Sequence, residues 1–155
     1  MNSKVNLIYI KSNGCFHCAN FAPIFDQLQI LLNKKKEDIK MNLEIKIYDK
    51  AKEKEFEEFK NIYPYLENWR NGVPSMFIDC LVNKDLKFDP IEPIFPETTK
   101  MNDINEINKA AQKIFNIFIY KYKQFTLQSG GNNNLKYKNK YLKYKNKYLL
   151  LKNIY

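Results

Sequence analysis

Two cysteines three residues apart, Cys15 and Cys18, are the residues of this chain best suited to carry chemistry. They follow an apolar run, 5–10, and precede residues of helical periodicity, so we expect a strand, a tight turn and a helix that begins at the pair. At a helix N-terminus, unpaired backbone N–H groups and the helix dipole favour an anion. That position favours the thiolate form of Cys15, which is the form that attacks disulfides. Cys18, one turn further on, is placed to attack a mixed disulfide at Cys15 and release the product.

Two other interpretations of the cysteine pair stay open. A Cys-x-x-Cys motif can form half of a zinc site, but the chain has only one further cysteine, Cys80, and one histidine, His17. Because a second ligand pair at zinc-finger spacing is missing, we favour redox chemistry and predict neither a metal nor another cofactor. The remaining interpretation is that the pair is buried and without function. For Cys80, at the end of an expected core strand, a free buried thiol is the favoured interpretation.

The size and composition of the chain fit one small domain with an appendage. Its 155 residues allow a core without disulfide staples, and three cysteines are too few for a secreted disulfide framework. The first apolar run is too short for a signal peptide, and no run approaches the ~18 apolar residues that span a bilayer. We therefore expect no membrane span and a cytosol-like compartment, where a redox-active pair is catalytic and not structural.

Charge is unevenly distributed along the chain. Residues 1–106 contain 15 basic and 17 acidic residues, whereas residues 107–155 contain 11 lysines and no acid, within a net charge of +9. The first part therefore resembles a near-neutral globular domain, and the basic character belongs to the end of the chain.

Periodicity and turn residues place the other elements of the domain. Alternating or continuous apolar residues predict strands at 5–10, 43–48, 73–80 and 86–88. Apolar residues at helical spacing predict helices over 18–32, 52–62 and 104–125. The last is expected to be capped by Asp103 and to have Ile104 and Ile107 on its inner side. Pro23 is expected to kink the first helix, and Pro90, Pro93 and Pro96 are expected to mark an irregular loop. The order β-α-β-α-β-β-α predicts an α/β domain with one core, over residues 1–127.

The end of the chain has a different pattern. Residues 128–134 form a Gly/Asn-rich linker. In residues 135–155 a seven-residue unit repeats, and tyrosines follow an a/d seam among lysines, which predicts a helical tail. The tyrosine seam favours self-association of the tail. The lysines could instead bind an anionic partner or, less favoured, nucleic acid. A third alternative is a tail that folds only when it binds a partner.

Three features of the domain occur in a characteristic order: Cys15-Phe16-His17-Cys18 at a helix start, Ala22-Pro23 within that helix, and Val73-Pro74 before a core strand. Together they resemble the thioredoxin-like superfamily, over roughly residues 4–126. The resemblance implies a central mixed sheet of about four strands flanked by three helices, to which the helical tail is added. It also implies an enzyme, a protein-disulfide oxidoreductase that exchanges disulfides with protein thiols. Val73-Pro74 would be a cis peptide beside Cys15, and the Val73 backbone would pair with an extended substrate segment.

The histidine inside the motif indicates a branch of the superfamily. Cys-x-His-Cys is similar to the motif of protein disulfide isomerases and of bacterial periplasmic oxidants, whereas the Cys-Pro-Tyr-Cys typical of glutaredoxins is absent, and Tyr9 occupies the likely position of the buried Asp of thioredoxins. A partly cationic His17 near the Cys15 sulfur would stabilise the thiolate, and with it the reduced protein. The pair would then be relatively oxidising. The alternative is that His17 faces solvent and tunes nothing.

The tail carries a second resemblance. Tyr/Lys heptads after a Gly-rich linker are similar to the ends of proteins of large cytoplasmic DNA viruses, which implies a host cytoplasm and packaging in virions. This supports an alternative function, that of a virion-associated interaction or structural protein. In that case the domain is a scaffold and the basic tail binds the partners.

Overall fold

The computed structural model describes residues 3–64, 72–82 and 85–127 of the chain. The linker predicted at 128–134 and the helical tail predicted at 135–155 lie outside the described residues, so the hypotheses on their partners stay predictions. Along the described chain the elements are β1 (Lys4–Lys11), α1 (Phe16–Asp38), β2 (Asn42–Asp49), α2 (Glu53–Ile62), β3 (Ser75–Val82), β4 (Asp85–Ile91), a 3-10 turn (Thr98–Lys100) and α3 (Ile104–Leu127).

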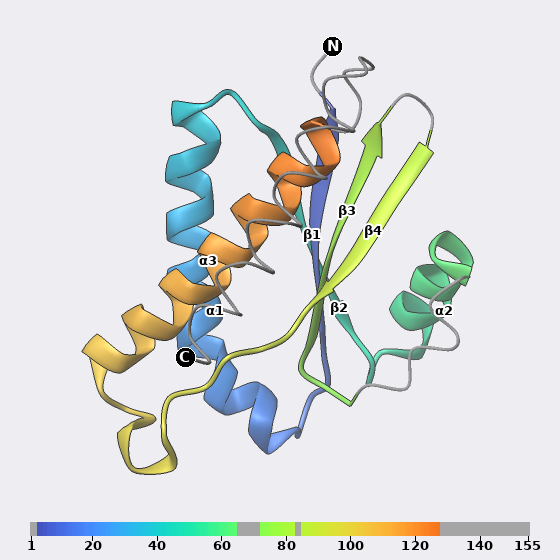
Figure 1. Cartoon of the computed structure of the whole chain (residues 1–155). Helices are drawn as coiled ribbons and strands as arrows, with labels where there is room; N and C mark the ends of the chain where they lie inside the picture. Colours follow the sequence, from blue (N-terminus) through green and yellow to red (C-terminus); the bar gives the residue numbers. More distant parts are fainter. Residues whose placement is uncertain (1–2, 65–71, 83–84, 128–155) are drawn as a thin grey trace, which may run out of the picture.

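The four strands form one mixed sheet in the order β2-β1-β3-β4. β1 pairs in parallel with β2, whereas β3 runs antiparallel to both β1 and β4. In Figure 1 helices α1 and α3 lie together on one side of the sheet and α2 lies on the other. This arrangement confirms the predicted α/β class, with a four-stranded mixed sheet and three helices in the described part of the chain.

Strand β1 is apolar on both faces because both faces are covered. Val5, Leu7 and Tyr9 belong to the larger core under α1 and α3. Ile8 and Ile10 point the other way, into a smaller cluster with the aromatic side chains of α2. Successive side chains of a strand alternate between faces, so one continuous apolar run serves both cores.

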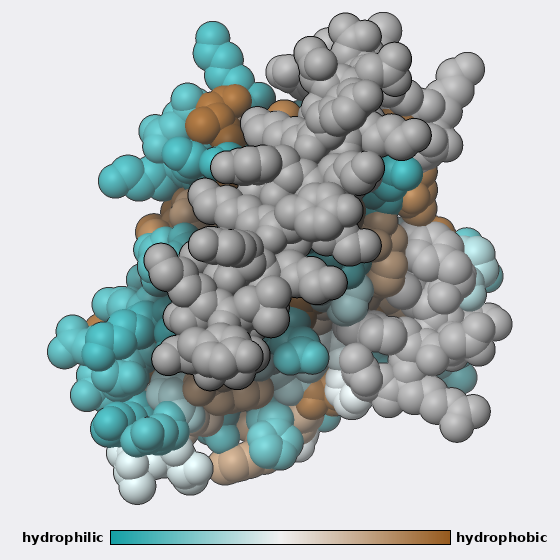
Figure 2. Space-filling model, in the orientation of Figure 1, coloured by the Kyte–Doolittle hydropathy of each residue, from teal (hydrophilic) through white to brown (hydrophobic). Residues whose placement is uncertain are grey.

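The long helices turn their apolar sides to the sheet. Asp103 caps α3 as predicted, since its Oδ1 accepts hydrogen bonds from the backbone N–H groups of Asn105 and Glu106. Ile107, expected on the inner side of α3, is buried, whereas Ile104, expected there too, is 58% exposed, because a helix's first turn extends past the sheet. Figure 2 shows mostly hydrophilic side chains at the left of the view, over the visible surface of α1 and the start of α3.

Two proline expectations meet different outcomes. Pro23 lies inside α1, which runs from Phe16 to Asp38, and the kink expected at Pro23 stays a prediction. Pro90 was expected in an irregular loop, and this is wrong: it lies within β4, opposite Phe77 of β3. β4 is an edge strand, where a residue without a backbone N–H is tolerated. No helix of the described residues is both long and apolar enough to cross a membrane.

Candidate functional site

The turn between β1 and α1 presents the first cysteine. The backbone N–H of Cys15 donates to the Ser12 carbonyl oxygen at 3.2 Å, which closes the turn. Gly14 has a φ of +79°, a conformation that residues with a side chain rarely adopt. Cys15 then stands at the N-cap of α1 in extended conformation. The sequence prediction of a strand, a tight turn and a helix starting at the cysteine pair is confirmed.

The Cys15 sulfur takes the place of the oxygen in an ordinary helix cap. Its Sγ accepts a hydrogen bond from the Cys18 backbone N–H at 3.2 Å, one of the donors that the first turn of a helix leaves unpaired. The thiol can also donate to the Val73 carbonyl oxygen, 3.5 Å away. Cys15 is partly exposed and all three cysteines are free thiols. The sulfur is thus accessible, and its anionic form faces a donor and a helix N-terminus.

Cys18 has a different environment from Cys15. Its side chain is only 6% exposed. Burial raises the pKa of the Cys18 thiol to about 11, and the hydrogen-bonded Cys15 sulfur adds to this effect. The pair therefore consists of an outer cysteine supported by a helix N-terminus and an inner cysteine kept in its neutral form.

Val73 and Pro74 lie beside the cysteine pair, as the resemblance implied. The bond between them is cis, and the Val73 carbonyl oxygen is the one that contacts the Cys15 sulfur. Ser75 begins β3, is buried, and donates its hydroxyl to the Gly72 carbonyl oxygen. Two contacts therefore hold the segment before β3: the internal hydrogen bond from Ser75 to Gly72, and the contact of the Val73 carbonyl oxygen with the Cys15 thiol at the start of α1.

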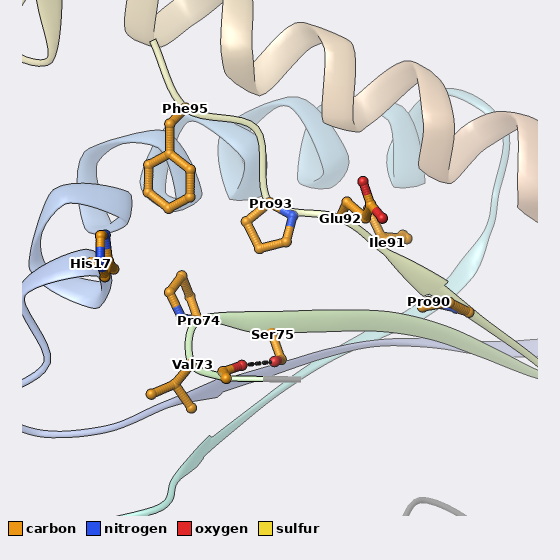
Figure 3. Close-up of a pocket in the computed structure, with 10 residues that line it drawn as sticks. His17, Val73, Pro74, Ser75, Pro90, Ile91, Glu92, Pro93 and Phe95 are labelled. Atoms are coloured by element: carbon orange, nitrogen blue, oxygen red, sulfur yellow. Dashed lines mark hydrogen bonds between the residues drawn. The ribbon is translucent and has the colours of Figure 1, made fainter. Parts of the chain in front are cut away.

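A groove of about 500 Å³ opens next to Val73-Pro74. Figure 3 shows Phe95 and Pro93 on one side of it, Val73, Pro74 and Ser75 on the opposite side, and His17 of α1 at its end. Apart from His17 and Glu92, the side chains that line the groove carry no charge. A groove of this volume with a mainly apolar lining suits a largely apolar ligand group.

His17 reaches the groove from the first turn of α1. It is exposed and meets the ring of Phe95 edge-on, with 6.4 Å between the ring centroids. Phe95 in turn packs against the buried Phe21 at 5.4 Å. The segment after β4 thus anchors one wall of the groove on α1. The role of His17 in tuning the Cys15 thiolate stays a prediction.

A second hollow, of about 280 Å³, is lined by both cysteines, neither of which lines the groove. Tyr9 and Asp26 line it together with Cys15 and Cys18. Tyr9 is buried and stacks on Phe25 at 4.2 Å between centroids. Burial raises the pKa of Tyr9, and the negative charge of an ionised Cys18 or Cys15 would raise it further, so the phenol stays neutral.

Cys80 is separated from this site by its place in the sheet. It is fully buried in β3 and pairs with Val5 of β1, at the end of β1 away from the cysteine turn. This confirms a buried free thiol. Within residues 3–64, 72–82 and 85–127, no three His, Cys, Asp or Glu side chains gather as metal ligands would.

Two residues of the site were not found by sequence reasoning. Phe95 lay in a segment expected to be an irregular loop. Asp49, whose Oδ1 accepts a hydrogen bond of 3.1 Å from the Asn13 backbone N–H in the cysteine turn, was simply the residue after an alternating strand. Only the apolar character of Phe95 between two prolines could have indicated a packed wall.

Comparison with models of known protein families and with curated proteins finds no match to this chain.

Proposed function

We propose that this chain is a thiol-disulfide oxidoreductase of the thioredoxin-like superfamily, acting on protein thiols and disulfides through Cys15 and Cys18. One observation carries the proposal: the partly exposed Cys15 sulfur caps α1, 3.2 Å from the Cys18 N–H and 3.5 Å from the Val73 carbonyl oxygen. An outer thiol at a helix N-terminus, an inner thiol one turn on and a groove beside them are the parts that disulfide exchange needs.

The reduction of a substrate disulfide would take two steps. The Cys15 thiolate attacks one substrate sulfur, so that a mixed disulfide forms, the substrate S–S bond breaks, and the leaving thiolate takes a proton from solvent. Cys18 then loses its proton and its thiolate attacks the Cys15 sulfur. A Cys15–Cys18 disulfide forms and the second substrate thiol leaves. Two electrons pass from the pair to the substrate, and the reverse sequence oxidises a substrate dithiol.

The groove supports a substrate in extended conformation. A segment lying between Phe95 and Val73-Pro74 would carry its sulfur toward Cys15, since Val73 contacts the Cys15 thiol. The backbone of Val73 is the proposed partner of that segment. We further propose that His17 makes the pair relatively oxidising, because a partly cationic imidazole near the thiolate stabilises the reduced protein.

The proposal includes a cytosol-like compartment. Because such compartments keep most thiols reduced, a reactive Cys-x-x-Cys pair there serves catalysis and not structure. The basic tail, on its sequence, would add self-association or an anionic partner, in a host cytoplasm or a virion. Removal of residues 129–155 followed by measurement of the mass in solution tests this part, and an unchanged monomer in both forms would contradict self-association.

Trapping of the mixed disulfide tests the catalytic part. In Cys18→Ser the second step is blocked, so incubation with a peptide disulfide should leave a peptide covalently attached to Cys15, located by mass spectrometry after digestion. Cys15→Ser should trap nothing, and Cys80→Ala combined with Cys18→Ser should trap as much as Cys18→Ser alone. Attachment at Cys80, or no attachment at all, would contradict the proposal.

A further inference from the structure

Asp49 is a buried carboxylate next to the turn that presents Cys15. It is the last residue of β2 and is only 7% exposed. Its Oδ1 accepts two backbone hydrogen bonds, from Asn13 at 3.1 Å and from Ala51 at 3.0 Å. A buried carboxylate is retained only where it is well bonded. Here the Asp49 oxygen joins the end of β2 to the turn at Asn13, which lies 36 residues earlier in the chain.

The bond to Asn13 acts on the cysteine turn directly. Asn13 lies between Ser12, whose carbonyl oxygen accepts the Cys15 N–H, and Gly14 with its positive φ. A second bond runs beside it, from the Lys50 N–H to the Lys11 carbonyl oxygen at 2.7 Å. Two hydrogen bonds thus fix the turn to the end of β2. One joins two backbone groups, and the other is accepted by the side chain of Asp49.

We infer that Asp49 is a positioning residue for Cys15: through Asn13 it holds the turn so that the Cys15 sulfur stays on the N–H groups at the start of α1. The inference concerns the same site as the proposed function and rests on it for its catalytic meaning. Its geometric part concerns the Cys15 thiol alone, however, and can be tested without any turnover.

The charge of Asp49 has an effect of its own, which must be separated from its geometry. The carboxylate contributes, after burial and the Cys15 hydrogen bond, to the raised pKa of Cys18. A negative charge nearby disfavours a thiolate, whereas a well-held turn favours it, so the two effects have opposite signs at Cys15. The other titratable groups that line the groove and the second hollow are Tyr9, Lys11, His17 and Asp26 from β1 and α1, and Glu92 from the segment after β4.

Two variants of Asp49 distinguish geometry from charge. Asp49→Asn keeps an acceptor oxygen for both N–H groups and loses the charge, whereas Asp49→Ala loses both. The rate of Cys15 alkylation by iodoacetamide would be measured from pH 5 to pH 10 in the full chain, with Cys15 identified by mass spectrometry. We expect Asp49→Ala to slow alkylation at pH 7 about tenfold, because the Cys15 sulfur is no longer held in position. Asp49→Asn should stay within about twofold of the wild type or react slightly faster.

Asp103 provides a matched control. It also accepts two backbone N–H bonds through Oδ1, but at the start of α3 and outside both hollows at the cysteine pair. Asp103→Ala should lower the urea midpoint by a loss of the cap and leave the Cys15 profile unchanged, which separates stability from positioning.

Each outcome decides the inference. Equal changes of the Cys15 alkylation rate in Asp49→Ala and Asp49→Asn would show that only the charge of Asp49 matters. Unchanged alkylation rates in both variants would show a merely structural role. Either result overturns the inference. If Asp49→Ala does not fold, Asp49→Ser replaces it, with a smaller slowing in the same direction, and wild-type reactivity of Asp49→Ser overturns the inference as well. If the chain does not exchange disulfides but the Asp49 variants change Cys15 alkylation as expected, the proposed function is rejected and the positioning role of Asp49 is not.

Discussion

The parallel half of the sheet and the antiparallel half supply different parts of the site. β1 and β2, with α1 between them, carry both members of the cysteine pair and Asp49. β3 and β4, with the segments before and after them, carry Val73-Pro74 and the groove wall at Phe95. A parallel connection places a helix N-terminus at the carboxyl end of the strands, where an anion is favoured. An antiparallel pair has no such terminus and provides backbone and apolar surface instead.

If the proposed function is correct, the two halves differ in role: the parallel half would perform the chemistry and the antiparallel half would recognise the substrate. Substitutions in the first half that impair the cysteine pair should then slow the reaction with every disulfide alike. Substitutions in the second half should weaken only the reaction with substrates large enough to enter the groove.

The largest effect is expected at Cys15. Cys15→Ser should lower the rate of disulfide exchange by at least about a thousandfold, with peptide and small-molecule disulfides alike, because the hydroxyl is not an effective nucleophile here. Turnover of a peptide disulfide and of the linear disulfide of 2-mercaptoethanol, followed side by side, checks this. A residual rate within tenfold of the wild type would place the reactive thiol elsewhere.

The pH dependence of the second step should be nearly as large. Burial raises the pKa of Cys18 to about 11, so between pH 7 and pH 10 its thiolate fraction rises about tenfold per pH unit. Release of a peptide from the preformed mixed disulfide at Cys15 should accelerate accordingly, and rapid-quench mass analysis would measure it. A release rate that is flat above pH 8 would contradict the buried, neutral state of Cys18.

A smaller and selective effect is expected at Phe95. Phe95→Ala removes the ring that packs on His17 and Phe21 and opens one wall of the groove. We expect kcat/KM for a peptide disulfide to fall about tenfold, equivalent to ~1.4 kcal/mol, while the rate with the linear disulfide of 2-mercaptoethanol is unchanged. The exposed Tyr120 on α3, changed to Ala, serves as the control. Equal losses with both disulfides would break the division between the two halves.

The smallest effect on activity is expected at Cys80, in the antiparallel half. Cys80→Ala should leave turnover within about twofold of the wild type, since sites far apart act independently. Its contribution is to stability: burial raises the pKa of Cys80 from 9.0 to about 11. The neutral thiol therefore stabilises the fold below pH 9, and this stabilisation is lost as the pH rises toward 11. The urea midpoint should fall over that range, and less steeply in Cys80→Ala; identical slopes would contradict this.

Local sequence signals predicted more of the parallel half of the site than of the antiparallel half. The cysteine turn and the helix start could be predicted because their signals are local: Gly14 for a positive φ, an apolar run before it and helical spacing after it. The strands and the cap at Asp103 were recognisable for the same reason. Phe95 and Asp49 were not, because their roles depend on contacts between segments distant in the chain.

Pro90 shows the limit of a local rule. Proline predicts irregular backbone, but on an edge strand it needs no donor, and which strand is the edge follows only from the sheet order. Ile104 shows the opposite limit. It has the right spacing for the inner side of α3, yet it lies where the helix extends past the sheet and is exposed.

The most direct test of the central claim is a redox titration of the Cys15–Cys18 pair in a series of glutathione buffers, read by mass after thiol alkylation. We predict a single cooperative two-electron transition that forms an intramolecular disulfide, with a midpoint more oxidising than the about −270 mV of a thioredoxin. His17→Ala should move that midpoint toward reducing values. If no Cys15–Cys18 disulfide forms at any poise, the two-cysteine mechanism is wrong.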